Sequence, residues 1–177
     1  VYIDQFAHAS LWEGVRMAGA QAHVFRHNQP KHLERLIAAH GAGLILVDSV
    51  YSADGSVCPL TEISAISERL DCILVVDESH AIGVYGPHGE GLVHTLGLTA
   101  KAHYRTFSLS KAFATRAGMV AGPQRVMTYF PYEARPAIFS SAVLQHEVAG
   151  LAATLKVIQE EEWRRQQLWA GGCDVVG

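Results

Sequence analysis

The stretch VVDESH at residues 75–80 decides how this chain is expected to fold. It completes an apolar segment, CILVV at residues 72–76, and polar side chains begin abruptly at Asp77. A segment this apolar is typical of a strand that is buried on both faces. A second β-prone segment, residues 104–108, leads in the same way into SLSK at residues 108–111. Because ligands bind at the carboxyl ends of strands in open α/β sheets, both strand ends are candidate binding positions.

An acid at one strand end and an amine at the next suit the cofactor pyridoxal 5'-phosphate (PLP). The amine of Lys111 can form a Schiff base, and the carboxylate of Asp77 can keep the pyridine nitrogen protonated so that the ring accepts electrons. Taken singly, such residues are more often turn formers, caps or surface charges. Their order favours a cofactor site: strand–Asp-x-x-His, a glycine-rich loop, then strand–Ser-x-Ser-Lys.

Composition excludes several other classes of protein. Of the 177 residues, 49% are apolar and 18% are charged, which suits a chain with a sizeable core. A net charge of -3 without a basic stripe argues against nucleic acid as a partner. Three cysteines without CxxC spacing fit a reducing compartment, so we expect a cytoplasmic protein. No apolar run is long enough for a membrane span, and no signal peptide is visible.

Strand and helix patterns alternate along the chain. Strands are expected at residues 1–3, 23–25, 44–48, 72–76, 104–108 and 119–122. Helices are expected after a Ser10 cap, from Pro30, from Pro59, and as one long helix over residues 141–169. This alternation predicts an α/β fold with a mostly parallel sheet and flanking helices. The glycine-rich loop at residues 83–91 does not have GxGxxG spacing, so a dinucleotide site is not expected.

Taken together, these motifs resemble the α-oxoamine synthases, PLP enzymes of fold type I that join an amino acid to an acyl-CoA. DESH at residues 77–80 resembles the family's Asp-Asp-Ala-His, SLSK resembles its Schiff-base segment, and FAHAS at residues 6–10 resembles its Asn-His-Ala-Ser stretch. The resemblance runs from about Tyr2 to Leu168. It implies that residues 1–169 are a partial large domain, without an N-terminal segment and a C-terminal small domain, and that residues 170–177 are a divergent tail.

The resemblance also implies roles for four residues around the cofactor ring. Lys111 would be the Schiff-base lysine and the acid and base at the substrate α-carbon. Asp77 would pair with the pyridinium nitrogen, and His80 would hydrogen-bond the ring 3-oxygen. His8 would stack on the ring face. Lys111 and His80 are thus the expected catalytic residues, and no metal ligand is implied.

Four serines would complete the cofactor site. Ser108 would contact the phosphate, and Ser52 would be a polar contact near the ring. Ser140 and Ser141 would reach the phosphate of the neighbouring subunit, so the resemblance implies a homodimer with shared active sites.

Within the family, the chain most resembles the quorum-sensing autoinducer synthases, which make α-hydroxyketone or aminoketone signals from a fatty acyl-CoA. The similarity lies in LWEG at residues 11–14, in DESH, and in PAIFSS at residues 136–141. Phe139 and Arg116 favour this branch over the biotin, haem and sphingolipid branches, which remain alternatives. The expected substrates are an acyl-CoA and an amino acid or amino-acid derivative.

Three other interpretations remain open. Ser108 and Lys111 could form a Ser-x-x-Lys acyl-transfer pair, although neither of its companion motifs follows. Asp77, Glu78, His80 and His88 could bind a metal, but they are a loose ligand set without HExxH. The chain could also be an inactive, truncated remnant. Because it resembles only part of longer proteins, the 177 residues alone are expected to retain PLP weakly and not to catalyse the reaction.

Overall fold

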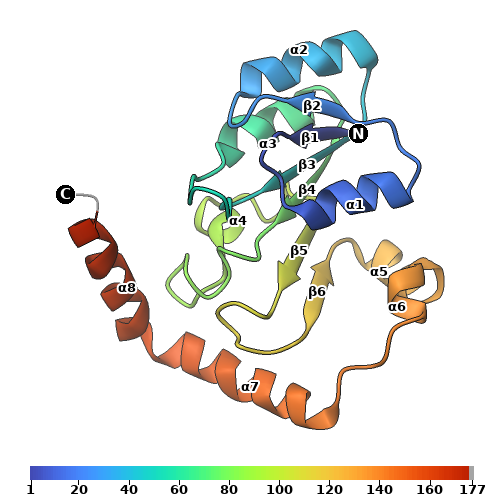
Figure 1. The fold of residues 1–177 in the computed structure, drawn as a ribbon. Coiled ribbons are helices and arrows are strands. Elements are labelled where there is room, and N and C mark those ends of the chain that lie inside the picture. The colour runs from blue at the N-terminus through green and yellow to red at the C-terminus, as the bar shows by residue number, and fades with distance from the viewer. Residues whose placement is uncertain (176–177) are drawn as a thin grey trace.

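The structure, a computed structural model, describes residues 1–175, with side chains described up to residue 172. Six strands form one sheet in the order β2-β1-β3-β4-β5-β6 (Figure 1). Their bounds are β1 Tyr2–Asp4, β2 His23–Phe25, β3 Leu44–Asp48, β4 Ile73–Asp77, β5 Tyr104–Ser108 and β6 Gly118–Ala121. All neighbouring strands pair in parallel except β5 and β6, which are antiparallel. The predicted α/β fold with a mostly parallel sheet is therefore confirmed.

Helices cover both faces of this sheet. Their bounds are α1 Ala9–Met17, α2 Pro30–His40, α3 Leu60–Arg69, α4 Leu92–Thr95, α5 Gln124–Glu133, α6 Arg135–Ile138, α7 Gln145–Glu160 and α8 Glu162–Val175. On one face α2 and α3 pack their apolar side chains against the strands in the larger core. On the other face α1 packs against Ile3, Leu46 and Val75 in a smaller core. The strands are apolar on both sides because each side faces a layer of helix.

The start of α1 differs from the sequence prediction. His8, and not Ser10, is the N-cap of the helix, and its ring Nδ1 accepts the main-chain N–H of Ser10 at 3.2 Å. The prediction of a Ser10 cap was wrong because the histidine two residues earlier already satisfies a free N–H of the first turn. This places the imidazole of His8 at the helix start, where β1 leads into α1.

The C-terminal helix is also different from the prediction. Instead of one helix over residues 141–169, α7 ends at Glu160 and α8 begins at Glu162, with a non-helical residue between them (Glu161, φ -104°, ψ 61°). Arg165 explains why α8 changes direction: its buried guanidinium donates to the carbonyls of Ile158 and Pro87. Residues 170–175 continue α8, and the rest of the predicted tail, residues 176–177, lies outside the described residues.

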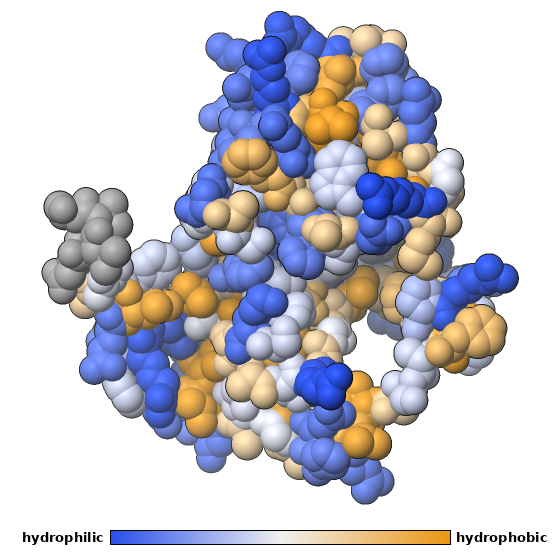
Figure 2. All heavy atoms as spheres, in the orientation of Figure 1, coloured by the Kyte–Doolittle hydropathy of each residue, from blue (hydrophilic) through white to orange (hydrophobic). Residues whose placement is uncertain are grey.

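Large apolar side chains lie at the surface of the second half of the chain. Phe139 is 81% exposed, and Tyr132, Leu144 and Val148 are also exposed. Figure 2 shows apolar side chains gathered at the surface along α7. Within the described residues, no helix is both long and apolar enough to cross a membrane.

Candidate active site

The floor of a pocket is formed by one row of residues that runs straight across four strands. Asp48 of β3 is in register with Asp77 of β4, Asp77 with Thr106 of β5, and Thr106 with Val120 of β6. All four line a pocket of about 400 Å³. Asp48 and Asp77 lie two residues beyond Leu46 and Val75, which pack against α1, so the pocket opens on the α1 face of the sheet.

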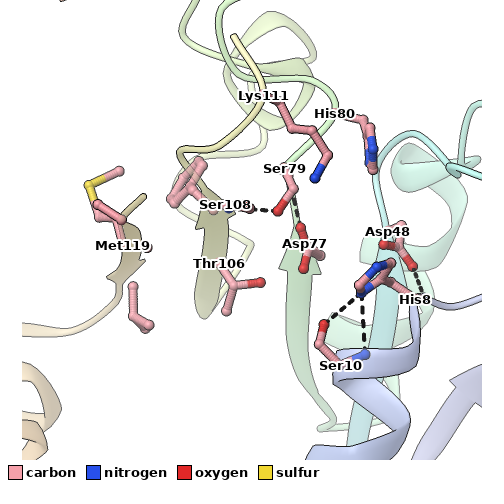
Figure 3. A pocket seen from close by; sticks show the side chains of 14 residues that line it. His8, Ser10, Asp48, Asp77, Ser79, His80, Thr106, Ser108, Lys111 and Met119 are labelled. Atoms are coloured by element: carbon pink, nitrogen blue, oxygen red, sulfur yellow. Dashed lines mark hydrogen bonds between the residues drawn. The ribbon is translucent and has the colours of Figure 1, made fainter. Parts of the chain in front are cut away.

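Five of the residues predicted from the sequence line this pocket: His8, Asp77, His80, Ser108 and Lys111. They come from three different places, namely the start of α1, the end of β4 and the end of β5. In Figure 3 the Lys111 amine and the His80 ring both point toward the strand ends that carry Asp77 and Asp48. The two motifs that suggested a cofactor site therefore meet at one pocket.

Three predicted serines do not line it. Ser52 is exposed in the loop after β3. Ser140 and Ser141 are exposed in the segment between α6 and α7, and the Ser140 hydroxyl donates to the carbonyl of Ala137 at 3.4 Å. None of the three is brought to the pocket residues within this one chain.

Hydrogen bonds hold the ends of β4 and β5 together beside the pocket. The Asp77 carboxylate, whose residue is only 8% exposed, accepts the main-chain N–H of Ser79 at 2.8 Å. The Ser79 hydroxyl in turn accepts the main-chain N–H of Ser108 at 2.7 Å. A short chain of contacts thus fixes the Asp77 side chain and sets the position from which the Lys111 segment departs.

The pocket changes the acidity of two groups. Burial lowers the pKa of His80, and the nearby charges of Lys111 and His8 lower it further, while Asp77 acts in the opposite direction. Burial raises the pKa of Asp48 to about 7; the N–H of His8 opposes this, and the charges of Asp77 and Asp4 add to it. Both effects favour the neutral form of a group inside the pocket.

Asp48 should make the fold lose stability as the pH rises. Its pKa is 3.8 before folding and about 7 in the folded chain, so only the folded chain holds the proton between these values. The stability that this proton provides is present below pH ~4 and is lost as the pH rises through ~7. Asp48→Asn cannot titrate. The difference between its free energy of unfolding and that of the unmodified chain should therefore grow by up to about 3 kcal/mol from pH 5 to pH 8, in favour of the variant. Urea unfolding at both pH values measures this, and an equal difference at both would contradict it.

A buried ion pair supports the pocket from beneath. The Glu78 carboxylate is 0% exposed, pairs with the Arg105 guanidinium, whose Nε lies 2.6 Å away, and accepts the main-chain N–H of Val93 at 2.8 Å. A Cβ at Gly91, where φ is +97°, would lie 2.8 Å from this carboxylate, so the loop can pass only with glycine. The Glu78 carboxylate is therefore already paired with Arg105. Within the described residues, no group of three possible metal ligands occurs.

Removing Arg105 should destabilise the fold strongly. Arg105→Met leaves the buried Glu78 charge without its partner, which is expected to cost about 3–5 kcal/mol in the free energy of unfolding. Arg69→Met is the matched control, because it breaks an ion pair with Glu34 that is exposed at the surface. Its cost should be about 1 kcal/mol or less. Urea unfolding of the two variants would decide the matter, and similar costs would show that burial of Glu78 does not matter.

The Ser-x-x-Lys interpretation finds no support in the geometry. The Ser108 hydroxyl lies 2.7 Å from the Ser110 hydroxyl, and within the described part of the chain no hydrogen bond joins it to Lys111. An acyl-transfer nucleophile needs its base within hydrogen-bond reach. Ser108 and Ser110 instead form a pair of hydroxyls at the end of β5.

Two polar residues of the pocket floor were missed in the sequence. Asp48 ends the buried segment LILVD just as Asp77 ends CILVVD, and this parallel could have identified it. Thr106 lies in the middle of the segment YRTFS at residues 104–108, where nothing marks it as a pocket residue. The register of the sheet, which the sequence does not state, brings both of them into the floor beside Asp77.

Comparison with known proteins identifies relatives that match most of the chain. Residues 1–171 match the family model "Aminotransferase class I and II". A CAI-1 autoinducer synthase of Vibrio campbellii is 51% identical over 169 residues, which is 96% of this chain and 43% of that protein. An 8-amino-7-oxononanoate synthase of Thermosipho melanesiensis is 37% identical over 169 residues, which is 94% of this chain and 43% of that protein.

Solved structures agree with this relationship. A serine palmitoyltransferase from S. paucimobilis with bound PLP–myriocin superposes with a TM-score of 0.91 at 26% identity, covering 99% of this chain and 46% of that chain. The chain thus spans less than half the length of the relatives that it matches. The resemblance to the α-oxoamine synthases predicted from the sequence is confirmed. From the family match and the shared sheet, we conclude that the chain belongs to the aminotransferase class I and II family.

Proposed function

We propose that this chain is the PLP-binding part of the large domain of an acyl-CoA:amino acid C-acyltransferase. The observation that carries the proposal is that Asp77 and Lys111, from the ends of two neighbouring strands, line one pocket. An acid for the ring nitrogen and an amine for the aldehyde are the two groups that PLP chemistry requires of a protein. Residues 1–169 would form this part, with residues 170–177 as an addition to it.

The pocket suits PLP in its other groups as well. The hydroxyls of Ser108 and Ser110 lie together at the end of β5 and can donate to a phosphate. The Thr106 hydroxyl oxygen is buried in the floor and has no hydrogen-bond partner among residues 1–175. Buried polar atoms rarely remain without a partner, so this oxygen is expected to gain one from a ligand. The residues present therefore fit the cofactor.

Each pocket residue has a definite task in this proposal. When bound, PLP supplies a ring that stabilises negative charge at the substrate α-carbon. The Asp77 carboxylate holds a proton on the ring nitrogen, and the Lys111 amine holds the cofactor covalently and moves the α-proton. The His80 ring, whose pKa is lowered by burial, would hydrogen-bond the ring 3-oxygen. The His8 ring would cover the ring face, and Ser52, which lies outside the pocket lining in the loop after β3, would be a supporting contact.

The proposed reaction joins an amino acid, or a derivative of one, to a fatty acyl-CoA and yields an aminoketone signal. The relative at 51% identity, an autoinducer synthase, favours this branch, and the relatives at 34–38% identity favour the biotin or haem branches. Mass spectrometry of products from a panel of acyl-CoA lengths and amino acids tests the proposal. An aminoketone made only from short or dicarboxylic acyl-CoA would favour another branch. No visible absorbance with PLP would leave an inactive remnant.

We also propose that two copies share their active sites. Ser140 and Ser141 are exposed, lie outside the pocket lining and follow the exposed Phe139. This arrangement is expected of residues that serve a partner's phosphate.

We also propose a cytoplasmic location, which the free thiols of Cys58 and Cys72 support.

Mixing two inactive variants tests the shared site. A Lys111→Ala chain still offers its serines, and a chain with Ser140→Ala and Ser141→Ala still offers its lysine. A heterodimer of the two should therefore contain one intact site and regain PLP trapping that neither homodimer shows. If mixing restores nothing while heterodimers form, each site is built from a single chain.

A further inference from the structure

Asp48 is a buried acid in the pocket for which the proposed chemistry has no task. The residue is 3% exposed, ends β3, and is in register with Asp77 on the neighbouring strand. Two carboxyl groups side by side in one pocket repel each other when both are ionised. A carboxyl group that is buried at this cost in free energy is expected to have a specific hydrogen-bond partner, and Asp48 has one.

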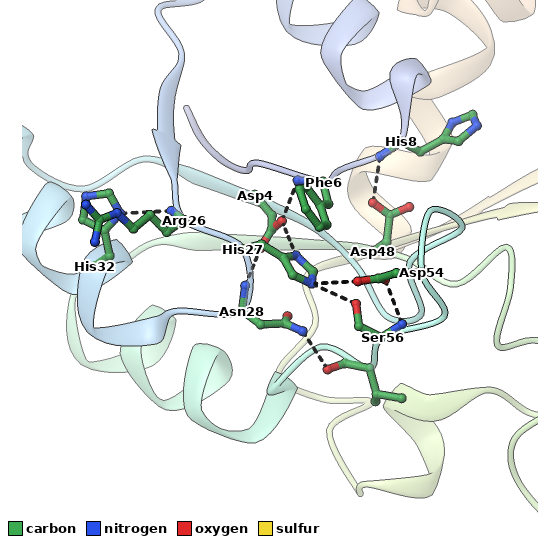
Figure 4. A network of polar contacts seen from close by, with 11 residues as sticks. Asp4, Phe6, His8, Arg26, His27, Asn28, His32, Asp48, Asp54 and Ser56 are labelled. Carbon is green, nitrogen blue, oxygen red and sulfur yellow. Dashed lines mark hydrogen bonds and ion pairs between the residues drawn. The ribbon is translucent and has the colours of Figure 1, made fainter. Parts of the chain in front are cut away.

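That partner is the main chain at His8. The Asp48 Oδ2 accepts the His8 N–H at 2.9 Å, across 40 residues of sequence (Figure 4). The His8 ring is fixed separately, because its Nδ1 accepts the Ser10 N–H and lies 2.9 Å from the Ser10 hydroxyl. Asp48 therefore fixes the main chain of His8, and Ser10 fixes the orientation of the His8 ring.

A second buried acid, four residues before His8, holds the same segment. Asp4, which is 0% exposed, accepts the Phe6 N–H at 2.8 Å and also binds His27 and the N–H of Asn28. The Asp4 network anchors the segment that leaves β1 to the ends of β2 and the loop after β3 (Figure 4). Beyond Phe6, the Asp48 contact carries the anchoring on to the pocket itself.

We propose that Asp48 is a positioning residue of the cofactor pocket, which through the His8 N–H holds the His8 imidazole over the floor beside Asp77. This inference rests on the proposed function, since it names what fixes the residue that covers the cofactor ring. It assigns a task to a side chain that neither the motifs nor the cofactor chemistry had used.

The charge state of Asp48 is coupled to the same pocket. The groups that face it are Asp77 from β4, Asp4 from β1 and His8 at the start of α1. With its pKa raised to about 7, Asp48 changes from mainly neutral to mainly ionised across the neutral range. Ionisation strengthens its bond to the His8 N–H, because hydrogen bonds to charged acceptors are stronger. The His8 segment should therefore be held more firmly at pH 8 than at pH 6.

The test uses three variants and two measurements. Asp48→Leu keeps the shape of the buried side chain and removes both oxygens, Asp48→Asn keeps a carbonyl acceptor, and Glu13→Gln removes an exposed acid of α1 as a control. The first measurement is the protection of the His8 amide hydrogen, that is, its exchange rate relative to the intrinsic rate at the same pH, followed by NMR without cofactor. The second is the PLP concentration that gives half-maximal borohydride trapping on the chain.

At pH 8, where Asp48 is mainly ionised, Asp48→Leu should speed exchange of the His8 amide by roughly tenfold or more, since a hydrogen bond to a charged group is lost. It should also raise the half-maximal PLP concentration several-fold. Asp48→Asn should stay within a few-fold of the unmodified chain in both measurements, and its His8 protection should no longer differ between pH 6 and pH 8. Glu13→Gln should change neither.

Unchanged His8 exchange in Asp48→Leu would overturn the inference, as would a loss of PLP trapping that Asp48→Asn shows equally. If Asp48→Leu does not fold, the pH dependence of His8 protection in Asp48→Asn decides instead, and a dependence equal to that of the unmodified chain refutes the proposal. If no variant, nor the unmodified chain, traps PLP, the proposed function fails, while His8 exchange still tests the positioning.

Discussion

Replacing Lys111 with alanine is expected to abolish the visible absorbance that PLP develops on binding to the chain. The reason is covalent: without the amine at this position, nothing in the pocket can bond to the cofactor's aldehyde. Lys111 is exposed at the pocket and its side-chain amine makes no hydrogen bond within the described residues, so the fold should be unaffected. Borohydride reduction at saturating PLP, followed by peptide mapping, measures the effect even where retention of the cofactor is weak.

Lys101→Ala provides the control for this experiment. Lys101 lies at the surface in an ion pair with Glu68 at 2.9 Å, away from the pocket lining, so its loss should leave trapping on Lys111 intact. Thermal unfolding of both variants should match that of the unmodified chain. Reduced PLP found on Lys31, Lys101 or Lys156 instead of Lys111 would refute the assignment.

The second large effect is expected at Asp77. Asp77→Asn keeps the shape of the side chain and a carbonyl oxygen that can still accept the Ser79 N–H, so the end of β4 should remain in place. It removes the negative charge that favours a protonated ring nitrogen. PLP should still be trapped on Lys111, while exchange of the substrate α-proton should fall by about 100-fold or more, within the range ascribed to acid–base steps. Deuterium exchange into the amino acid, followed by NMR, measures this loss.

Asp54→Asn removes an acid of similar size from the exposed loop after β3, outside the pocket lining, and should leave α-proton exchange unchanged. Near-normal exchange in Asp77→Asn would show that another group keeps the ring protonated. An equal fall in both variants would point to net charge and not to the position of Asp77.

The sequence predicted the parts of the fold that depend on local pattern. The ends of β4 and β5 were correct to within a residue, because the change from apolar to polar side chains at Asp77 and Ser108 marks where each strand leaves the core. Pro30 and the residue after Pro59 begin helices as expected, since proline suits the first turn. These signals depend only on neighbouring residues, so they can be recognised in a single sequence.

Features that depend on distant partners were not predictable in this way. The break at Glu161 depends on Arg165 reaching the carbonyl of Pro87, which is 78 residues away. The cap of α1 is His8 and not Ser10, and Asp48 holds the main chain of His8 from another strand. In each case the local pattern allowed a longer helix or a different cap, and the observed arrangement includes a contact across the fold.

The residues of the candidate site also fall into a group that local motifs predict and a group that depends on distant partners. His8, Asp77, His80, Ser108 and Lys111 stand in recognisable motifs, and they line one pocket. Asp48 and Thr106 became visible only through the register of the sheet. For Ser52, Ser140 and Ser141, the relevant partner is a cofactor or a second chain, so their roles stay predictions.

The single row of residues that floors the pocket limits how the protein can change. Side chains alternate between the two faces of a strand, so deletion of one residue within β4 would turn Asp77 toward the layer of α2 and α3 and bring an apolar neighbour into its position. Substitutions in the row alter the pocket's chemistry, and length changes in the loops beyond the strands alter its walls. A length change inside β3, β4 or β5 would remove an acid or a hydroxyl from the pocket altogether. The four strand lengths therefore act as a frame of fixed spacing, within which the binding chemistry can be varied only one side chain at a time.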